Sequence, residues 1–303
     1  MTSVAPAAGA AVTATASRWL VLMPIVFVIL WSTGFIVAKF GLPYAPPLTF
    51  LLLRFGGVAL VLFPLVLFAR APWPHGRVAD IALSGVLVHA GYVGGVWCAI
   101  RLGMPAGLAA LIVGMQPVLT AFAAPMIGER VMPRQWIGLL LGIGGVGLVV
   151  SNKISMIGLS MGSIGLAVFG LLTITLGTLY QKHRCAHFDL RSGTLIQYVA
   201  SALVMLPLAI HFENFDLAMS AVHWTPRFIG ALLWAILVLS IGAVFLLFAL
   251  IRRSAATSVT SLLYLTPPTT ALMAWAMFGE VFSLTGLAGM VLAVAGVAFV
   301  VKK

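Results

Sequence analysis

Residues 47–69 read PLTFLLLRFGGVALVLFPLVLFA, and this stretch contains a single charged residue, Arg54. A transmembrane helix needs roughly 20 consecutive apolar residues, so the stretch is long enough to cross a bilayer as one helix. Nine further apolar runs, each bounded by charge, glycine or proline, lie on either side of it. The ten predicted helices cover residues 19–41, 47–69, 79–100, 106–127, 135–151, 157–181, 193–211, 227–250, 257–278 and 284–301.

The composition of the chain agrees with an all-α membrane protein. Of its 303 residues, 62% are hydrophobic and 8% are charged, and the mean hydropathy is +1.16. Soluble proteins carry about 25% charged residues because water-facing surface needs them, so this chain has too few charges for a soluble globule. The formal net charge of +11 does not indicate a nucleic-acid partner, because no basic stretch is longer than two residues.

The basic residues instead predict how the helices are oriented. With the N-terminus inside, the outer side holds Arg101, Lys153 and Arg227, while Lys39 and Arg54 lie within spans. The remaining 12 of the 17 basic residues then lie on the inner side. They are Arg18, Arg70, Arg77, Arg130, Arg134, Lys182, Arg184, Arg191, Arg252, Arg253, Lys302 and Lys303. This excess of inner positive charge predicts a multi-pass protein with both termini in the cytoplasm.

The chain contains an internal repeat at an offset of 151 residues. The matched positions are Pro117 with Pro268, Gly128-Glu129 with Gly279-Glu280, Gly138 with Gly289, and Gly145 with Gly296. We therefore expect a disordered cytoplasmic tail over 1–18 and two five-helix repeats over 19–151 and 152–303. Because five is odd, the second repeat enters the membrane from the opposite side. Inverted repeats are typical of transporters, although a duplication can also be purely structural.

Several of these residues carry a resemblance to a known family. They are the segment Trp31-Ser32-Thr33-Gly34-Phe35-Ile36-Val37-Ala38-Lys39, then Arg54, then Pro117 with Gly128-Glu129-Arg130, and then Pro268 with Gly279-Glu280. In them the chain resembles the drug/metabolite transporter superfamily, in its ten-helix EamA branch. Within the branch, it is most similar to the aromatic amino acid exporters of the YddG type. The resemblance implies a metabolite exporter of the inner membrane. Val281 stands where the first copy has Arg130, so a role of that arginine is not carried over.

Polar and aromatic groups deep in a span face the bundle interior or a cavity by default. Trp31 and Lys39 share one face of the first span, where they form either a cavity wall ending in a cation or ordinary packing with a snorkelling lysine. The third span carries His89, Tyr92 and Trp97. The histidine either contacts substrate or is a satisfied interior residue. The aromatic rings either stack on an aromatic substrate or pack in the core.

Two helices with prolines in corresponding positions point to a central site. Proline lacks an N–H and bends a helix, which frees a backbone carbonyl inside the membrane. The prolines are Pro117 in the fourth span and Pro267 and Pro268 in the ninth. The expected substrate-binding neighbours on these and the sixth span are Gln116, Tyr264, Thr173 and Tyr180.

Charged residues inside or at the ends of spans are expected to be structural or gating groups. Arg54 either contacts substrate or bonds to backbone carbonyls, and its counterpart in the second half is Gln197. Glu129 and Glu280 lie at span ends, and no acidic residue lies deep in a predicted span. Carboxylates are the common proton relays of pumps, so facilitated diffusion is favoured over proton antiport unless His89 or a terminal glutamate carries the proton.

Other function classes find little support in the sequence. The pattern GxGxxG over residues 142–147 lies in an apolar span without a preceding strand, so it predicts close helix packing together with Gly138 rather than a dinucleotide site. No phosphate-binding Walker A motif occurs, and the isolated GxSxG at residues 158–162 gives only slight support to an intramembrane enzyme. We expect no enzyme activity, cofactor, metal or catalytic residue.

The sequence therefore predicts a bilayer-embedded exporter of a small molecule, working by alternating access. Aromatic or bulky neutral amino acids are the expected substrates. Another metabolite, a drug, or a phosphorylated solute held by Lys39 and Arg54 is the alternative within transport. The sequence leaves the oligomeric state open.

Overall fold

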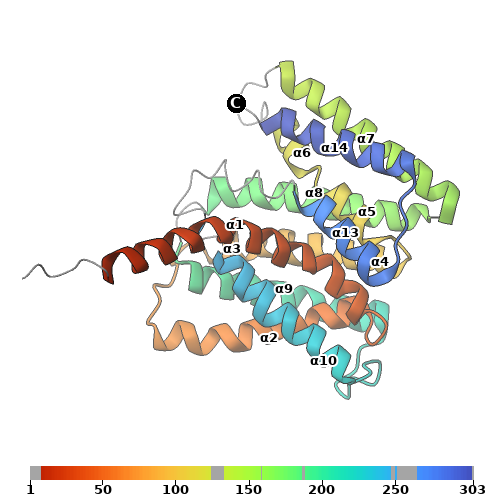
Figure 1. Ribbon diagram of the computed structural model, residues 1–303. Helices are drawn as coiled ribbons and strands as arrows, with labels where there is room; N and C mark the ends of the chain where they lie inside the picture. Colours follow the sequence, from red (N-terminus) through yellow and green to blue (C-terminus); the bar gives the residue numbers. More distant parts are fainter. Residues whose placement is uncertain are drawn as a thin grey trace, which may run out of the picture.

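The computed structural model describes residues 8–123, 133–157, 159–185, 188–246, 250 and 265–301. The elements in these ranges are helices (Figure 1). They are α1 (Ala8–Gly41), α2 (Pro47–Phe68), α3 (Val78–Gly85), the π-helix η1 (Val86–Gly91), α4 (Tyr92–Arg101), α5 (Ala106–Val113), α6 (Gln116–Ala123), α7 (Pro133–Ile157), α8 (Met161–Arg184), α9 (Leu190–Glu213), α10 (Pro226–Leu233), the π-helix η3 (Trp234–Ala243), α13 (Thr266–Phe278) and α14 (Leu284–Val301).

Six stretches are long and apolar enough to cross a membrane. They are Leu22–Gly41, Pro47–Phe68, Val78–Arg101, Met161–Arg184, Leu190–Glu213 and Pro226–Leu246. This confirms the expectation of an all-helical protein with several membrane spans, because in lipid a helix satisfies its own backbone hydrogen bonds.

Local sequence signals explain where several helices begin. Ser160 accepts a hydrogen bond from the backbone N–H of Ser163, 3.1 Å away, and so caps the start of α8. Thr225 accepts one from the N–H of Phe228 at 3.2 Å and caps α10 in the same way. At Pro47, the first residue of α2, the missing N–H would have had no partner inside the helix, so proline is tolerated there.

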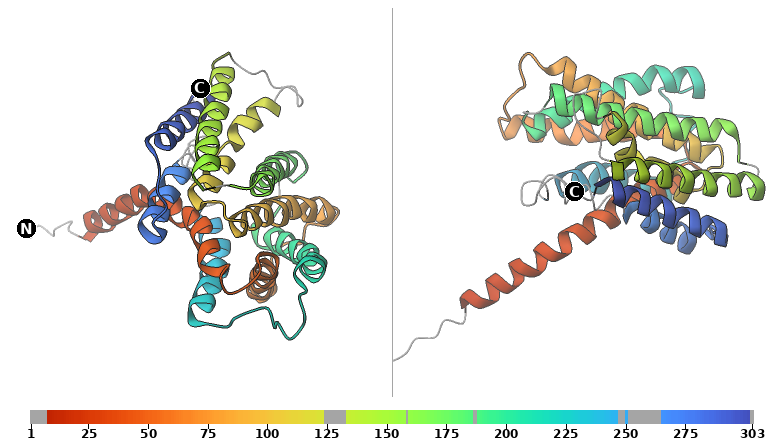
Figure 2. Two further views of the ribbon diagram at one scale, coloured as in Figure 1. Left: turned by 90° about the vertical axis from the view of Figure 1, so that its right-hand side faces the viewer. Right: turned by 90° about the horizontal axis from the view of Figure 1, so that it is seen from above.

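Two helix pairs lie at opposite ends of the bundle, α7 with α14 and α2 with α9 (Figures 1 and 2). Glycines bring the backbones of α7 and α14 together. A Cβ atom added at Gly145 would lie 2.5 Å from the carbonyl oxygen of Gly289, and one at Gly289 would lie 2.7 Å from the carbonyl oxygen of Gly145. The structure confirms the predicted packing through small residues, which replaces the dinucleotide interpretation of residues 142–147.

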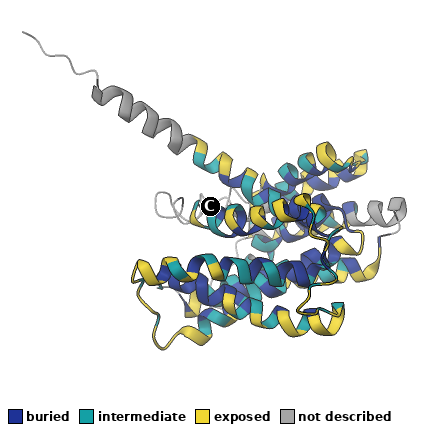
Figure 3. Cartoon of the chain, turned by 90° about the horizontal axis from the view of Figure 1, so that it is seen from below, coloured by how far each residue is buried: buried dark blue, intermediate teal, exposed yellow. Residues whose placement is uncertain are grey.

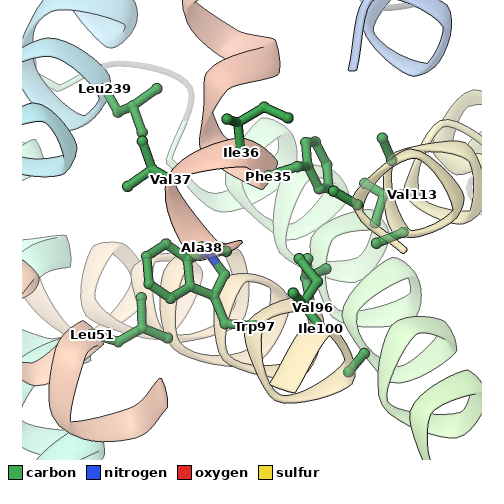
Figure 4. Packing of buried hydrophobic residues seen from close by; sticks show 14 of the residues in the cluster. Phe35, Ile36, Val37, Ala38, Leu51, Val96, Trp97, Ile100, Val113 and Leu239 are labelled. Carbon is green, nitrogen blue, oxygen red and sulfur yellow. The ribbon is translucent and has the colours of Figure 1, made fainter. Parts of the chain in front are cut away.

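The central core is formed where α1 crosses the bundle between these two pairs. In Figure 4, Val37 faces Leu239 of η3, while Phe35 faces Val113 of α5. Trp97 lies beneath Ala38 and is only 2% exposed. Helix α1 therefore contacts both halves of the chain.

Exposed residues lie along the outer faces of the bundle (Figure 3). Many large hydrophobic side chains are exposed there, among them Leu60 and Phe68 of α2, Leu140 of α7, Leu172 of α8 and Phe212 of α9. So much exposed apolar surface over several helices suits contact with lipid rather than with water. Together with the six spans, it identifies a multi-pass membrane protein.

Candidate functional site

Arg54 joins helices from the two halves of the chain. Its side chain is 9% exposed, and its Nε donates a hydrogen bond to Oγ of Ser240 in η3, 3.0 Å away. The side chains of Tyr198 on α9 and of Tyr92 lie within reach of the charge on Arg54. The guanidinium is therefore oriented by a hydroxyl of η3 and lies beside a neutral group of α9.

His89 lies in η1 beside this arginine. Its ring stacks on the ring of Tyr198, with the centroids 4.4 Å apart and the planes at 18°. The ring of Phe55, next to Arg54 on α2, is 6.1 Å from His89. Tyr198 and Phe55 are fully buried, whereas His89 and Tyr92 are half-buried. We call Arg54, His89, Tyr92, Tyr198 and Ser240 the Arg54 cluster.

The π-helical segment η1 places His89 against α9. A π-helix is widened by one residue per turn and often marks a functional site. A close approach of the backbones supports this position, since a Cβ atom at Gly85 would lie 2.5 Å from Cα of Gln197. Gln197 Nε2 donates to Oγ of Ser84 at 3.0 Å and to Oε1 of Gln181 at 3.4 Å. Gln197, expected to correspond to Arg54, thus ties α9 to α3 and α8.

Lys39 forms an ion pair with Glu280, a residue that is distant from it in the sequence. Its Nζ lies 2.6 Å from Oε1 of Glu280 and 4.7 Å from the centre of the Phe278 ring. Glu280 also accepts hydrogen bonds from the first backbone N–H groups of α5, at 3.0 Å from Ala106 and 3.5 Å from Gly107. Neither sequence interpretation of Lys39, a substrate-facing cation or a snorkelling side chain, describes this contact, because the carboxylate neutralises the ammonium group.

The fourth predicted span, 106–127, is interrupted in its middle, at the position where Pro117 was expected to bend the helix, and residues 124–127 lie outside the described residues. Helix α5 ends at Val113, and α6 begins at Gln116 after a turn at Gly114 and Met115. Pro117 has no N–H for the carbonyl of Val113, which explains the break at this point. Gln116 Nε2 donates to Oγ1 of Thr178 on α8 at 3.1 Å, so the interruption is tied to the second half.

Three other candidate residues lie outside the Arg54 cluster. The Trp31 ring lies tilted against that of Phe27, with the centroids 5.4 Å apart, and packs in a small cluster with residues beyond the end of η3. Trp97 packs on Phe50 at 4.7 Å in the main core. The hydroxyl of Thr173 bonds to carbonyls of its own helix. The structure thus places these side chains in packing contacts.

The remaining candidates lie at helix ends or outside the described residues. The Tyr180 hydroxyl donates to Oδ1 of Asp80 at 2.5 Å, near the start of α3. Pro267 and Pro268 occupy the first turn of α13, where proline fits without bending a helix. Tyr264 and Glu129 are outside the described residues.

Each carboxylate that the structure describes has a partner other than Arg54. The acceptors are Asp80 for Tyr180, Asp189 for Arg191, Glu213 for the N–H groups of Leu48 and Thr49, Asp216 for Ser220, and Glu280 for Lys39. Hydrogen bonding from Arg191 lowers the pKa of the Asp189 carboxyl, and bonding from the Ser220 hydroxyl does the same for Asp216. In the described ranges, no group of three or more His, Cys, Asp or Glu could hold a metal ion.

Two contacts were not predicted from the sequence. Glu213 at the end of α9 accepts hydrogen bonds from the N–H groups of Leu48 and Thr49, at 2.8 and 2.7 Å, and thus caps α2. Ser240 is the partner of Arg54, and the one available signal was its position as an isolated hydroxyl within the apolar run 228–251.

Known proteins are similar to this chain in sequence and in fold over most of its length. The chain is 30% identical over 288 residues to the "Uncharacterized transporter YvbV" of Bacillus subtilis (strain 168), covering 91% of this chain and 89% of that protein. It is 29% identical over 280 residues to a "Probable amino-acid metabolite efflux pump" of Salmonella typhimurium, covering 90% and 92%. A solved crystal structure has the same fold, with a TM-score of 0.63 at 19% identity and coverage of 92% and 94%.

The family match covers both halves. The profile of the EamA-like transporter family matches residues 18–151 and again residues 161–302. This bears out the resemblance to the EamA branch and indicates a transporter of small molecules rather than an enzyme. The chain belongs to the EamA-like transporter family.

Proposed function

We propose that this protein exports amino acids or closely similar metabolites across the inner membrane, with aromatic and bulky neutral amino acids as the first candidates. The observation that carries the proposal is the Arg54 cluster, in which a buried cation and two half-buried rings of the first half meet Tyr198 and Ser240 of the second half within the spans. Polar groups at such depth are costly and mark substrate pathways. The similarity to a protein named as a probable amino-acid metabolite efflux pump supports the substrate class.

The proposal includes ten membrane helices arranged as two inverted five-helix repeats, 19–151 and 152–303, with both termini in the cytoplasm. Corresponding element ends support the repeat. Helices α1 and α8 end at Gly41 and Arg184, and α2 and α9 begin six residues later in each case. Helices α3 and α10 each pass into a π-helix after eight residues, at Val86 and Trp234.

The inferred mechanism is alternating access by facilitated diffusion. The interrupted helix α5–α6 supports this mechanism, because discontinuous helices at the repeat interface line the substrate sites of many transporters. Lys39 and Glu280 join α1 to α13, and separation of these helices would open one end of the bundle. The described carboxylates are all engaged at helix ends or in loops, which leaves none in the Arg54 cluster to relay a proton.

Export of a phosphorylated solute is the weaker alternative. A phosphate carries about two negative charges at neutral pH and would use both Lys39 and Arg54. Because Glu280 already neutralises Lys39, Arg54 alone remains for the ligand among the cations described within the spans. This charge balance favours a substrate with one carboxylate.

The test is uptake of labelled tryptophan, phenylalanine, leucine and glutamate into liposomes containing the purified protein, with and without a pH gradient. We expect saturable flux of the aromatic amino acids that exceeds that of glutamate and does not depend on the gradient. A Leu60→Ala variant, altered at a lipid-facing position, serves as the control and should behave as wild type. Flux that never exceeds the leak of protein-free liposomes would exclude the amino acid assignment. Flux that requires the gradient would exclude facilitated diffusion.

A further inference from the structure

We infer that Arg54 binds the carboxylate of the transported substrate. The inference rests on the proposed function, since it names the group on the amino acid that the protein recognises. It assigns the ligand of the Arg54 cluster to the class of monocarboxylates.

The first step concerns the free-energy cost of burying the positive charge of Arg54. Arginine stays protonated in proteins, so the 9% exposed Arg54 guanidinium carries a full positive charge inside a membrane-spanning helix. Ions in such places pair with an opposite charge, with backbone carbonyls or with a ligand, because an uncompensated buried charge is strongly destabilising. The Ser240 hydroxyl orients the guanidinium, and Tyr198 lies beside it, but both are neutral and do not cancel its charge.

The second step is the identity of the missing anion. The carboxylates of the described residues are bound elsewhere, and the nearest in sequence, Glu213, is held by Leu48 and Thr49 at the start of α2. Lys39, the other basic residue that the sequence analysis placed within a span, has its own carboxylate in Glu280. In the described part of the chain the protein therefore supplies a counter-ion to Lys39 and none to Arg54. A ligand with one negative charge completes the cluster.

The third step concerns the shape of the Arg54 guanidinium group and the side chains around it. The guanidinium is a planar fork that pairs with both oxygens of a carboxylate, and the bond from Nε to Ser240 fixes the orientation of that plane. His89 and Tyr92 beside it are half-buried residues, whereas Tyr198 and Phe55 are buried and contact the His89 ring. A carboxylate on Arg54 would place the rest of an amino acid next to the His89 and Tyr92 rings, where aromatic contact is favourable.

The experiment compares tryptophan with tryptophanamide, which lacks the negative charge, in wild type and in Arg54→Gln. Uptake is measured at about pH 6, where both carry the α-ammonium group, after subtraction of the leak into protein-free liposomes. Wild type should favour the acid by at least about tenfold, because a site built for a carboxylate rejects an analogue without it. In Arg54→Gln, acid uptake should fall by at least about tenfold while amide uptake changes by less than about threefold.

Two variants distinguish recognition of the substrate carboxylate by Arg54 from a structural role of this residue. Arg54→Lys keeps the charge but not the fork, so it should recover part of the preference for the acid. Lys39→Gln removes the other cation described within the spans and should change acid and amide uptake by the same factor. Size-exclusion profiles and thermal unfolding of each variant check that it is folded.

The outcomes are distinguishable. An unchanged acid-to-amide ratio in folded Arg54→Gln, with wild type transporting tryptophan, overturns this inference and leaves the proposed function standing. Equal loss of both fluxes assigns Arg54 a structural role and also overturns it. Absence of wild-type flux for every amino acid removes the proposed function and this inference with it.

Discussion

The ion pair between Lys39 and Glu280 should make a measurable contribution to the free energy of unfolding of the transporter. The perturbation is Glu280→Gln, which removes the charge but keeps an oxygen for the N–H of Ala106. In the structure the carboxylate lies 2.6 Å from Nζ of Lys39 and 3.0 Å from the Ala106 nitrogen. The variant therefore tests the ion pair with little change in shape.

The expected magnitude follows from the burial of the two side chains. Removing one partner of a fully buried ion pair costs about 3–5 kcal/mol, whereas an exposed pair contributes about 0–1 kcal/mol. The Glu280 side chain is 7% exposed and that of Lys39 is 29% exposed, so the pair lies between these limits. We expect a coupling free energy of about 2 kcal/mol, which corresponds to roughly a 30-fold change in an equilibrium constant.

The assay is a double-mutant cycle of wild type, Lys39→Met, Glu280→Gln and the double variant. The free energy of unfolding is measured by reversible denaturation in mixed micelles, with tryptophan fluorescence as the probe. The matched control is the same cycle for Asp189 and Arg191, whose side chains are 21% and 40% exposed and should couple by less than about 1 kcal/mol. A Lys39–Glu280 coupling no larger than that of the control pair would refute the argument from burial.

Three further predictions concern helix packing and helix ends. Gly145→Val should lower the free energy of unfolding by at least about 2 kcal/mol, because the added side chain meets the α14 backbone. The control Gly144→Val has no atom within 4 Å of an added Cβ, so its free energy of unfolding in the same assay should stay within about 0.5 kcal/mol of wild type. Glu213→Gln should cost about 1–2 kcal/mol by weakening the cap of α2, and Asp216→Asn in the exposed loop should cost far less in that assay. Pro117→Ala restores an N–H at the interrupted helix, so it should raise the melting temperature and slow substrate flux; unchanged flux would contradict a role for the break.

Several features of the transporter were predicted from the sequence because their causes are local. Apolar runs become helices in lipid because the backbone has no water to bond with, and six of the predicted spans appear as long apolar helices. Gly142 and Gly145 pack against α14 as expected, because the absence of a Cβ atom permits close approach wherever the partner lies.

The partners of the polar side chains were not predicted. Spacing along a helix indicates which residues share a face, but not which neighbour that face meets or at what depth. His89 and Trp97 were both predicted as candidates on the third span, yet one lies against Tyr198 and the other against Phe50. Tyr180, expected at the central site, bonds to Asp80 in the first turn of α3.

The sequence by itself determined the protein class and six of the membrane spans, because hydropathy, proline and glycine act over one or two helical turns. Only the tertiary structure decided that Lys39 is neutralised by Glu280, 241 residues away, and that Arg54 meets Ser240, 186 residues away. Those contacts depend on the rotation and depth of each helix within the bundle, which the packing of all the helices sets together. The charge left on Arg54, and therefore the ligand inferred for it, follows from that packing.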